Sequence, residues 1–136
     1  MGRHHARVGL APLGLIAGLV FAAGAAALAC LDMLVAMGMK MENIFVTDIA
    51  GVVYTGRVAE MDDNKARYAK DTKARTLSEV IGGADILLGL SAAGVVKPDM
   101  VKAMAANPII LALANPTPEI MPEEVKAVRG DAIIAT

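Results

Sequence analysis

The stretch that decides the fold is Val20-Phe-Ala-Ala-Gly-Ala-Ala-Ala-Leu-Ala-Cys30, in which an apolar run leads into small residues and then into a helical pattern. In a dinucleotide-binding fold, small residues at such a turn let backbone N–H groups approach a pyrophosphate at the start of a helix. The pattern G-x-G-x-x-G/A places Ala22, Gly24 and Ala27 at its three small positions. Alanine at the first position costs about 1–2 kcal/mol if the turn needs a positive φ there. On the motif alone, an alanine-rich packed helix or a membrane-embedded run explains the stretch equally well.

The rest of the chain alternates between short apolar runs and helical segments. The runs predict strands at Leu19–Ala22, Ile44–Thr47, Asp85–Leu90, Pro108–Leu113 and Ala132–Ala135. Each run is nearly continuous in apolar residues, which is typical of strands that are covered on both faces. The segments between them predict helices over Ala25–Met37, Met61–Ala69, a capped turn from Thr76 onward, Pro98–Ala106 and Pro122–Val128. We therefore expect an α/β fold, a three-layer Rossmann-type parallel sheet of four or five strands with helices on both faces.

Asp48 ends the second predicted strand, 24 residues after Gly24. In this class of fold, a carboxylate about 20 residues beyond the glycine turn binds the ribose hydroxyls of the dinucleotide. An aspartate in this place is explained as well by a turn or a helix cap, so the spacing leaves both roles open.

The composition is that of one folded domain. The chain has 136 residues, is 56% hydrophobic and carries a net charge of −1, which is not the profile of a disordered chain. It has no basic excess and few aromatic residues, which argues against nucleic-acid binding. Cys30 is the single cysteine, which excludes an internal disulfide and a cysteine-based zinc site, and we expect it to be an inert buried thiol. We interpret residues 62–75 as a solvated charged face, and His4 and His5 as a solvated tail without a metal.

The N-terminal part allows a second interpretation, because residues 8–31 carry no charge. A run of this length is a candidate for a membrane span, and with Arg3 and Arg7 before it also for a signal peptide. Pro12 and several glycines weigh against one continuous helix. We therefore expect a cytoplasmic chain, with a membrane-anchored or exported domain that uses residues 8–31 as the alternative.

Several long stretches resemble the nucleotide-binding region of bacterial malic enzymes. The turn and helix read Gly24-Ala-Ala-Ala-Leu-Ala-Cys-Leu-Asp-Met-Leu-Val-Ala-Met-Gly38, and the next strand and loop read Glu42-Asn-Ile-Phe-Val-Thr-Asp-Ile-Ala-Gly-Val-Val-Tyr-Thr-Gly-Arg57. Further similar stretches are Ala74–Asp85, Leu88–Pro98, Ile110–Ile120 and Arg129–Thr136. We interpret residues 20–136 as an NAD(P)-binding domain of malic-enzyme type, truncated at both ends, whereas residues 1–19 match nothing in the family.

This resemblance implies oxidative decarboxylation of malate to pyruvate and CO2, by a homo-oligomeric enzyme with NAD or NADP as hydride acceptor and Mg2+ or Mn2+ as Lewis acid. By position in the family pattern, the residues of the pyrophosphate turn are Ala22, Gly24, Ala25 and Ala26. The resemblance likewise assigns Asp48 to the adenosine ribose, Ser91 and Ala92 to the loop over the nicotinamide side, and Asn115 to both nicotinamide and malate. A carboxamide at Asn115 suits that place, because it donates and accepts hydrogen bonds without charge. The alternative for Asn115 is a turn residue before Pro116.

The chain also departs from the family pattern. Ala22 replaces the first glycine of the turn, and the family's catalytic tyrosine, catalytic lysine and acidic metal ligands lie upstream of it. Residues 1–19 contain neither a carboxylate nor a tyrosine, so we expect no catalytic residue, no metal ligand and no activity in this chain alone. The alternative is a non-catalytic remnant that binds no cofactor, because Ala22 spoils the turn. The sequence does not decide whether the cofactor is NAD or NADP. Asp48 repels the 2′-phosphate of NADP, and the positive charge of Arg57, Lys65 or Lys70 could offset that repulsion.

Overall fold

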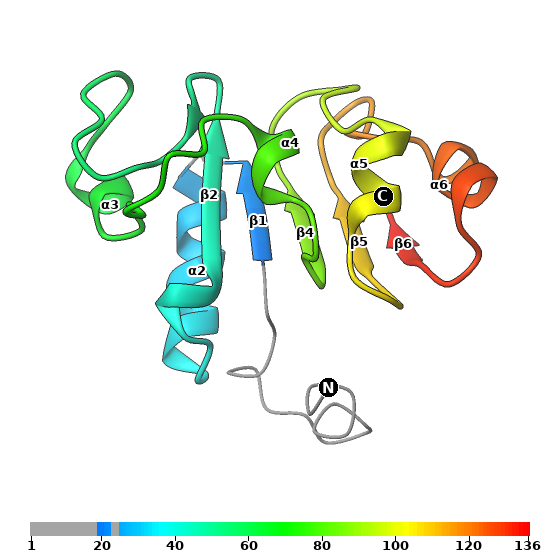
Figure 1. Cartoon of the computed structure of the whole chain (residues 1–136), viewed down its shortest axis with the longest axis horizontal. Helices are drawn as coiled ribbons and strands as arrows, with labels where there is room; N and C mark the ends of the chain where they lie inside the picture. Colours follow the sequence, from blue (N-terminus) through cyan, green and yellow to red (C-terminus); the bar gives the residue numbers. More distant parts are fainter. Residues whose placement is uncertain (1–18, 23–24) are drawn as a thin grey trace.

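The computed structural model describes residues 19–22 and 25–136 of the chain. Within them the strands form one sheet in the order β3-β2-β1-β4-β5-β6 (Figure 1). All neighbouring pairs are parallel except β2 and β3, which are antiparallel. The strands are β1 Leu19–Ala22, β2 Ile44–Asp48, β3 Gly51–Val52, β4 Ile86–Gly89, β5 Ile109–Ala112 and β6 Ile133–Ala135. This is the strand order of doubly wound dinucleotide-binding sheets, with a short antiparallel strand at one edge.

Helices cover both faces of the sheet, which confirms the three-layer α/β prediction. They are α2 Ala25–Ala36, the 3-10 turn η2 Met41–Asn43, α3 Asp63–Ala66, α4 Leu77–Val80, α5 Pro98–Ala103 and α6 Pro122–Val128. On one face, Leu28 and Leu31 of α2 pack with Val46 and Leu88 of the sheet. On the other face, the three later helices α4, α5 and α6 lie over side chains such as Leu87. Successive strand residues therefore enter different cores, which explains why the strands are apolar without interruption.

The local signals in the sequence fix where several helices begin. Thr76 accepts a hydrogen bond from the backbone N–H of Glu79, and the Glu79 side chain accepts one from the Thr76 N–H, which completes the predicted capping box. Asp62 caps α3 through the Lys65 N–H, but α3 ends at Ala66, well short of the predicted Ala69. Helix α5 ends at Ala103 instead of Ala106.

The sheet differs from an all-parallel one at β3. Asp48 Oδ1 accepts a hydrogen bond from the Ala50 N–H at 2.9 Å, and this turn reverses the chain so that β3 pairs back onto β2. Gly51 has a φ of +95°, and a Cβ there would lie 2.1 Å from the Arg75 carbonyl oxygen. Two-residue connections of this kind join antiparallel strands only. The strand is too short to give a periodic signal, which is why the sequence did not predict it.

Helix α2 corrects one prediction about burial. Cys30 is exposed, together with Met33 and Met37, whereas Ala27 and Leu31 are buried against the sheet. The helix is apolar on both its buried and its exposed sides, so hydrophobicity did not indicate which side Cys30 occupies. None of the helices in the described part of the chain combines the length and the apolar character that a membrane crossing requires. Residues 8–18 of the alternative span lie outside the described residues.

Candidate functional site

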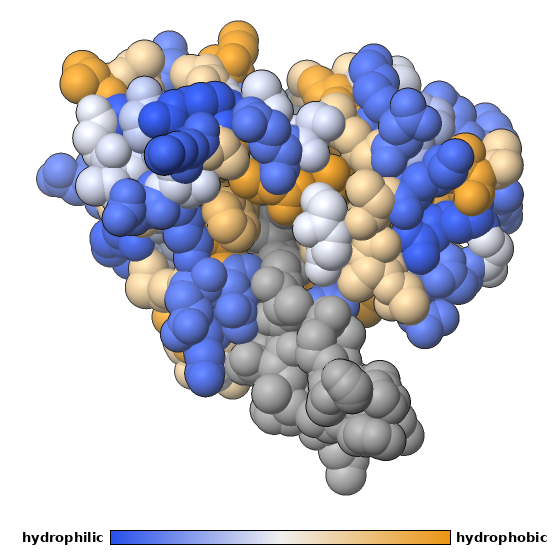
Figure 2. Space-filling view, viewed as in Figure 1, coloured by the Kyte–Doolittle hydropathy of each residue, from blue (hydrophilic) through white to orange (hydrophobic). Residues whose placement is uncertain are grey.

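A cavity of about 260 Å³ lies at the carboxyl ends of β2 and β4, on the sheet face that α4 covers. Ligands of open α/β sheets bind outside the carboxyl ends of the strands, so this is the expected edge. Its wall is largely apolar, and hydrophobic surface gathers over the region of α4 and β4 in the space-filling view (Figure 2). The lining residues are Thr47, Asp48, Ile49, Gly51, Leu77, Leu87, Gly89, Ser91, Ala92, Val95, Val96 and Glu119.

The structure brings three of the predicted cofactor residues together in this cavity. Asp48 comes from the end of β2, and Ser91 and Ala92 come from the loop that follows β4. Asn115 is exposed in the loop after β5 and is not among the residues that line the cavity. These positions are the expected ones for loops at the carboxyl edge of a parallel sheet.

The predicted pyrophosphate turn is described only at its two ends. Ala22 is the last residue of β1, and Ala25 and Ala26 open α2. Gly24 and its neighbour at position 23 lie outside the described residues. The strand and the helix thus follow each other in the order that the motif predicts.

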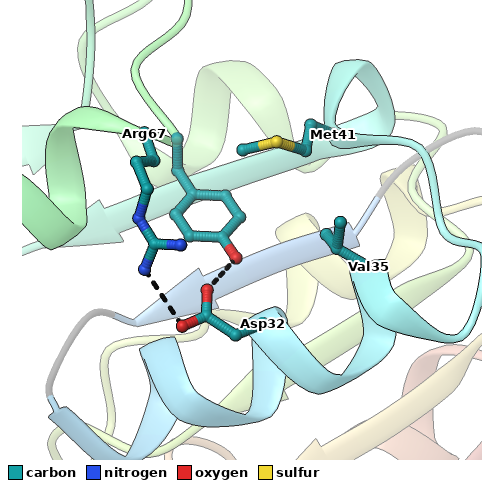
Figure 3. A pocket seen from close by; sticks show the side chains of 5 residues that line it. Asp32, Val35, Met41 and Arg67 are labelled. Atoms are coloured by element: carbon teal, nitrogen blue, oxygen red, sulfur yellow. Dashed lines mark hydrogen bonds and ion pairs between the residues drawn. The ribbon is translucent and has the colours of Figure 1, made fainter.

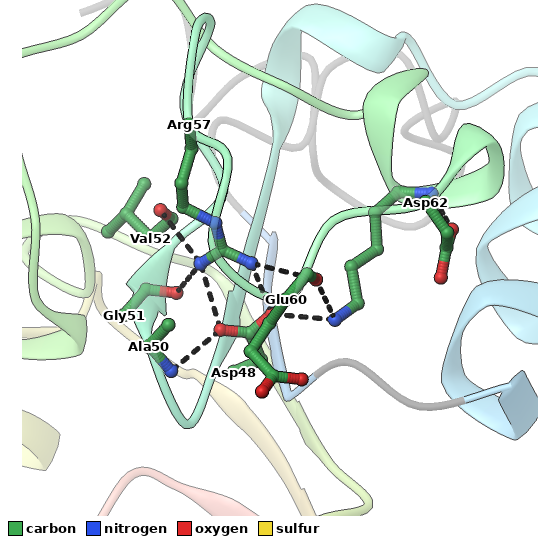
Figure 4. A network of polar contacts seen from close by, with 8 residues as sticks. Asp48, Ala50, Gly51, Val52, Arg57, Glu60 and Asp62 are labelled. Carbon is green, nitrogen blue, oxygen red and sulfur yellow. Dashed lines mark hydrogen bonds and ion pairs between the residues drawn. The ribbon is translucent and has the colours of Figure 1, made fainter.

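Asp48 is held by a dense set of hydrogen bonds (Figure 4). Arg57 donates to both carboxylate oxygens, at 2.8 and 2.5 Å, and Lys65 Nζ donates to Oδ2 at 2.8 Å. Lys65 Nζ also donates to the Glu60 carbonyl oxygen at 2.7 Å. The side chains of Arg57, Asp48 and Lys65 are 3%, 5% and 13% exposed. One carboxylate and two cations in contact leave the three side chains with a net charge of +1.

The electrostatics of this cluster keep Asp48 ionised. Burial raises the pKa of the Asp48 carboxyl, but the hydrogen bonds from Arg57 and Lys65 outweigh it and hold the pKa below its usual range. Lys65 belongs to the stretch that we interpreted as a solvated face, and that interpretation was wrong for this residue. Lys70, the third cation considered, lies elsewhere: its Nζ donates to the Met41 carbonyl oxygen at 2.7 Å and sits over the Phe45 ring.

Sequence reasoning missed Glu119, a buried carboxylate in the wall of the cavity. Its side chain is 1% exposed, and it accepts hydrogen bonds from the backbone N–H groups of Ser91 and Ala114. Both donors are backbone groups, so no residue type in the sequence could have indicated this contact.

A second cavity, of about 300 Å³, lies between α2 and the segment after α3 (Figure 3). Tyr68 donates a hydrogen bond to Asp32 Oδ1 at 2.5 Å, and Arg67 donates to Oδ2 at 3.0 Å. Val35 and Met41 complete its wall. Burial and the hydrogen bond to Asp32 raise the pKa of the Tyr68 hydroxyl to about 12. The polar groups here satisfy one another, and the cavity is not at the carboxyl edge of the sheet, so it is the weaker candidate site.

The described residues contain no group of three or more His, Cys, Asp or Glu side chains placed to hold a metal ion.

Comparison with known proteins identifies the family. The family described as "Malic enzyme, NAD binding domain" matches residues 10–136, so the match begins upstream of residue 20. An NAD-dependent malic enzyme of Rhizobium meliloti is 60% identical over 114 residues, and an NADP-dependent malic enzyme of Haemophilus influenzae is 60% identical over 115 residues. Each alignment covers 84% of this chain and 15% of the relative.

Solved structures agree with this assignment. The crystal structure of Entamoeba histolytica malic enzyme matches with a TM-score of 0.79 at 30% identity, over 90% of this chain and 27% of that chain. The NAD-dependent malic enzyme of Thermotoga maritima matches with a TM-score of 0.79 at 28% identity, over 90% of this chain and 33% of that chain. The chain spans about 15% of the length of the two curated relatives named above. The fold, the residues that line the cavity at the carboxyl edge of the sheet and these matches agree, and the chain belongs to the malic enzyme family, whose NAD-binding domain it matches.

Proposed function

We propose that this chain binds NAD or NADP along the cavity at the carboxyl ends of β2 and β4, with the adenosine ribose at Asp48 and the nicotinamide side toward Ser91 and Ala92. The observation that carries the proposal is that Asp48, Ser91 and Ala92, from two separate loops, line one cavity at the carboxyl edge of the sheet. The apolar side chains of Leu77, Leu87 and Val96 suit an adenine ring.

The residues present also fit the phosphates of a dinucleotide. Helix α2 is 12 residues long and has no acidic residue in its first turn, so nothing in that turn neutralises the partial positive charge of its N-terminus. A pyrophosphate would lie at this end, beside the turn that contains Gly24. The small side chain of Ala26, in the first turn of α2, leaves room for its approach.

The Asp48 cluster bears on the choice between the two cofactors. Both carboxylate oxygens of Asp48 already accept hydrogen bonds, and Lys65 and Arg57 make the cluster net positive. This charge offsets the repulsion that a lone aspartate exerts on a 2′-phosphate. We propose that the chain accepts NADP as well as NAD.

In a longer enzyme of this family, we propose that this part serves the oxidative decarboxylation of malate. The bound cofactor would act as the hydride acceptor. The loop after β4 holds Ser91 and Ala92 in the cavity wall, and the loop after β5 presents Asn115 at the same edge of the sheet. The carboxamide of Asn115 can donate a hydrogen bond to a substrate oxygen and accept one from a cofactor amide. We expect the 136-residue chain alone to show no malate-dependent reduction of NAD or NADP with Mn2+ present.

Calorimetric titration of the chain with NAD and NADP tests the proposal. We expect weak binding of both by the wild type, and loss of binding in Gly24→Val, because a β-branched side chain would occupy the space where phosphate approaches the backbone. Ala22→Gly should bind more tightly if the alanine strains the turn. Equal binding by Gly24→Val would place the ligand elsewhere. Absence of binding in all three proteins would favour the remnant that binds no cofactor.

A further inference from the structure

We propose that Glu119 is a positioning residue for the dinucleotide: its buried carboxylate fixes the loop after β4 against the loop after β5. The inference rests on the proposed function, because it assigns Glu119 a role in shaping the wall of the proposed cofactor cavity. Glu119 lies in the segment that leads into α6, far in the chain from the residues at the end of β4.

The carboxylate joins the two loops through one hydrogen bond to each. Oε2 accepts from the Ser91 N–H at 2.8 Å, and Oε1 accepts from the Ala114 N–H at 3.1 Å. Ser91 lines the cavity, and Ala114 immediately precedes Asn115. The two strands before these loops are already joined where the Leu113 N–H donates to the Gly89 carbonyl oxygen, and the Glu119 side chain extends this connection to the backbones that present the two predicted site residues.

Backbone contacts from the same segment hold the rest of the loop after β4. The Glu119 carbonyl oxygen accepts a hydrogen bond from the Val96 N–H at 3.2 Å, and the Pro118 carbonyl oxygen accepts one from the Gly94 N–H at 3.3 Å. The loop is thus fixed to residues 118–119 near its start, at Ser91, and near its end, at Val96. The side chain of Glu119 is the part of this connection that a substitution can remove.

Gly89 is what allows the carboxylate to lie there. A Cβ at Gly89 would lie 2.6 and 2.8 Å from the two carboxylate oxygens of Glu119, and its three nearest neighbours would all be atoms of that carboxylate. The last residue of β4 and Glu119 are therefore matched in size. A side chain at position 89 would displace the carboxylate from the two N–H groups that it accepts from.

The chemistry of the contact requires a carboxylate. The two backbone N–H groups come from different loops, and each needs its own acceptor oxygen. A glutamine amide has only one oxygen, and its NH2 group would face the second backbone N–H, donor against donor. Burying a carboxylate costs free energy that an apolar residue of the same volume would not. We infer that the carboxylate is buried here because it holds the two loops of the cavity wall in place.

The first test compares the wild-type chain with Glu119→Gln, with Glu124→Gln as the matched control. Glu124 is exposed and accepts only a helix-capping hydrogen bond from the Met121 N–H among the described contacts. We expect Glu119→Gln to bind NAD about tenfold more weakly in calorimetry, in proportion to one lost charge-assisted hydrogen bond. Its Ser91 and Ala114 amide protons should also exchange faster with solvent. Glu124→Gln should match the wild type in both measurements.

The second test uses Gly89→Ala in two backgrounds and does not depend on the stability of Glu119→Gln. Gly89→Ala should weaken NAD binding in the wild type, and should weaken it no further in Glu119→Ala, where no carboxylate remains to be displaced. A purely structural role would lower the melting temperature of these variants and leave the NAD affinity of the folded protein unchanged.

The outcomes separate this inference from the proposed function. If the wild type and Glu119→Gln bind NAD equally well, the positioning role is overturned and the proposed function stands. If the wild type binds no NAD, the proposed function is overturned and the positioning role with it. Equal amide exchange at Ser91 and Ala114 in the two proteins would overturn the carboxylate contact itself.

Discussion

Arg57 donates hydrogen bonds to both carboxylate oxygens of Asp48, and both side chains are almost fully buried at the end of β2. The same guanidinium donates to the carbonyl oxygens of Gly51 and Val52, so it joins the strand end, the β2–β3 turn and β3. The pair therefore does two things at once. It fixes the antiparallel edge of the sheet, and it holds a charged cluster at the place where the adenosine ribose is expected.

Removing Arg57 should destabilise the chain strongly. Arg57→Ala leaves the buried Asp48 carboxylate with Lys65 as its only cationic partner among the described contacts, and we expect the free energy of unfolding to fall by about 3 kcal/mol. Arg57→Lys keeps the charge and loses the bidentate geometry, so its free energy of unfolding should lie between those of the wild type and Arg57→Ala. Urea unfolding followed by circular dichroism measures all three proteins. A loss of less than about 0.5 kcal/mol in Arg57→Ala would mean that the pair contributes no more than an exposed ion pair.

Lys65 should discriminate between the two cofactors. Lys65→Ala removes one of the two cations from the cluster at Asp48, so its affinity for NADP should fall by about tenfold or more relative to its affinity for NAD. Lys73→Ala, at an exposed position, makes the same change in net charge and should leave the ratio of the two affinities unchanged. Equal losses for NAD and NADP in Lys65→Ala would show that the 2′-phosphate does not lie at this cluster.

The Asp48 cluster also predicts a dependence of stability on pH. The pKa of Asp48 is lower in the folded than in the unfolded chain, so its stabilising contribution is complete above the unfolded value of about 3.9 and is lost as the pH falls through the folded value. The difference in the free energy of unfolding between the wild type and Asp48→Asn should therefore be constant at neutral pH and shrink in acid. Urea titrations across this range measure it. A difference that stays constant down to about pH 2 would contradict the lowered pKa.

Asp32 should control the ionisation of Tyr68. Burial and the hydrogen bond to Asp32 raise the pKa of Tyr68 to about 12. In Asp32→Asn the acceptor loses its charge, so the pKa of Tyr68 should fall toward the ordinary value of about 10 while burial keeps it somewhat above. Absorbance of the phenolate during alkaline titration measures this, with Asp99→Asn as a control on an exposed aspartate. An unchanged titration curve would show that burial alone raises this pKa.

The sequence predicted the elements whose cause is local. The apolar runs located β1, β2, β4, β5 and β6, because a strand covered on both faces leaves a continuous run of such residues. Thr76 and Pro98 located the starts of two helices. Strand β3 was not predicted, because it depends on the Asp48–Ala50 turn and on Arg57 rather than on a pattern of its own.

The site residues at the ends of strands could be predicted from the sequence. Those that reach the site through the course of a loop could not. Asp48, Ser91 and Ala92 follow parallel strands, so the topology alone brings them to one edge. Lys65 reaches Asp48 through a loop whose course no periodicity specifies. Glu119 contacts backbone N–H groups in two other loops, and such contacts leave no trace in residue types.

Amide nitrogen–proton spectra of the chain, recorded during titration with NADP, test the claim that a dinucleotide binds at the carboxyl ends of β2 and β4. We expect the largest shifts at Asp48, Ser91, Ala92 and Val96, and none at Asp32 or Tyr68 in the second cavity. Shifts that cluster around Asp32 and Tyr68, or a spectrum that does not change at saturating NADP, would contradict the claim.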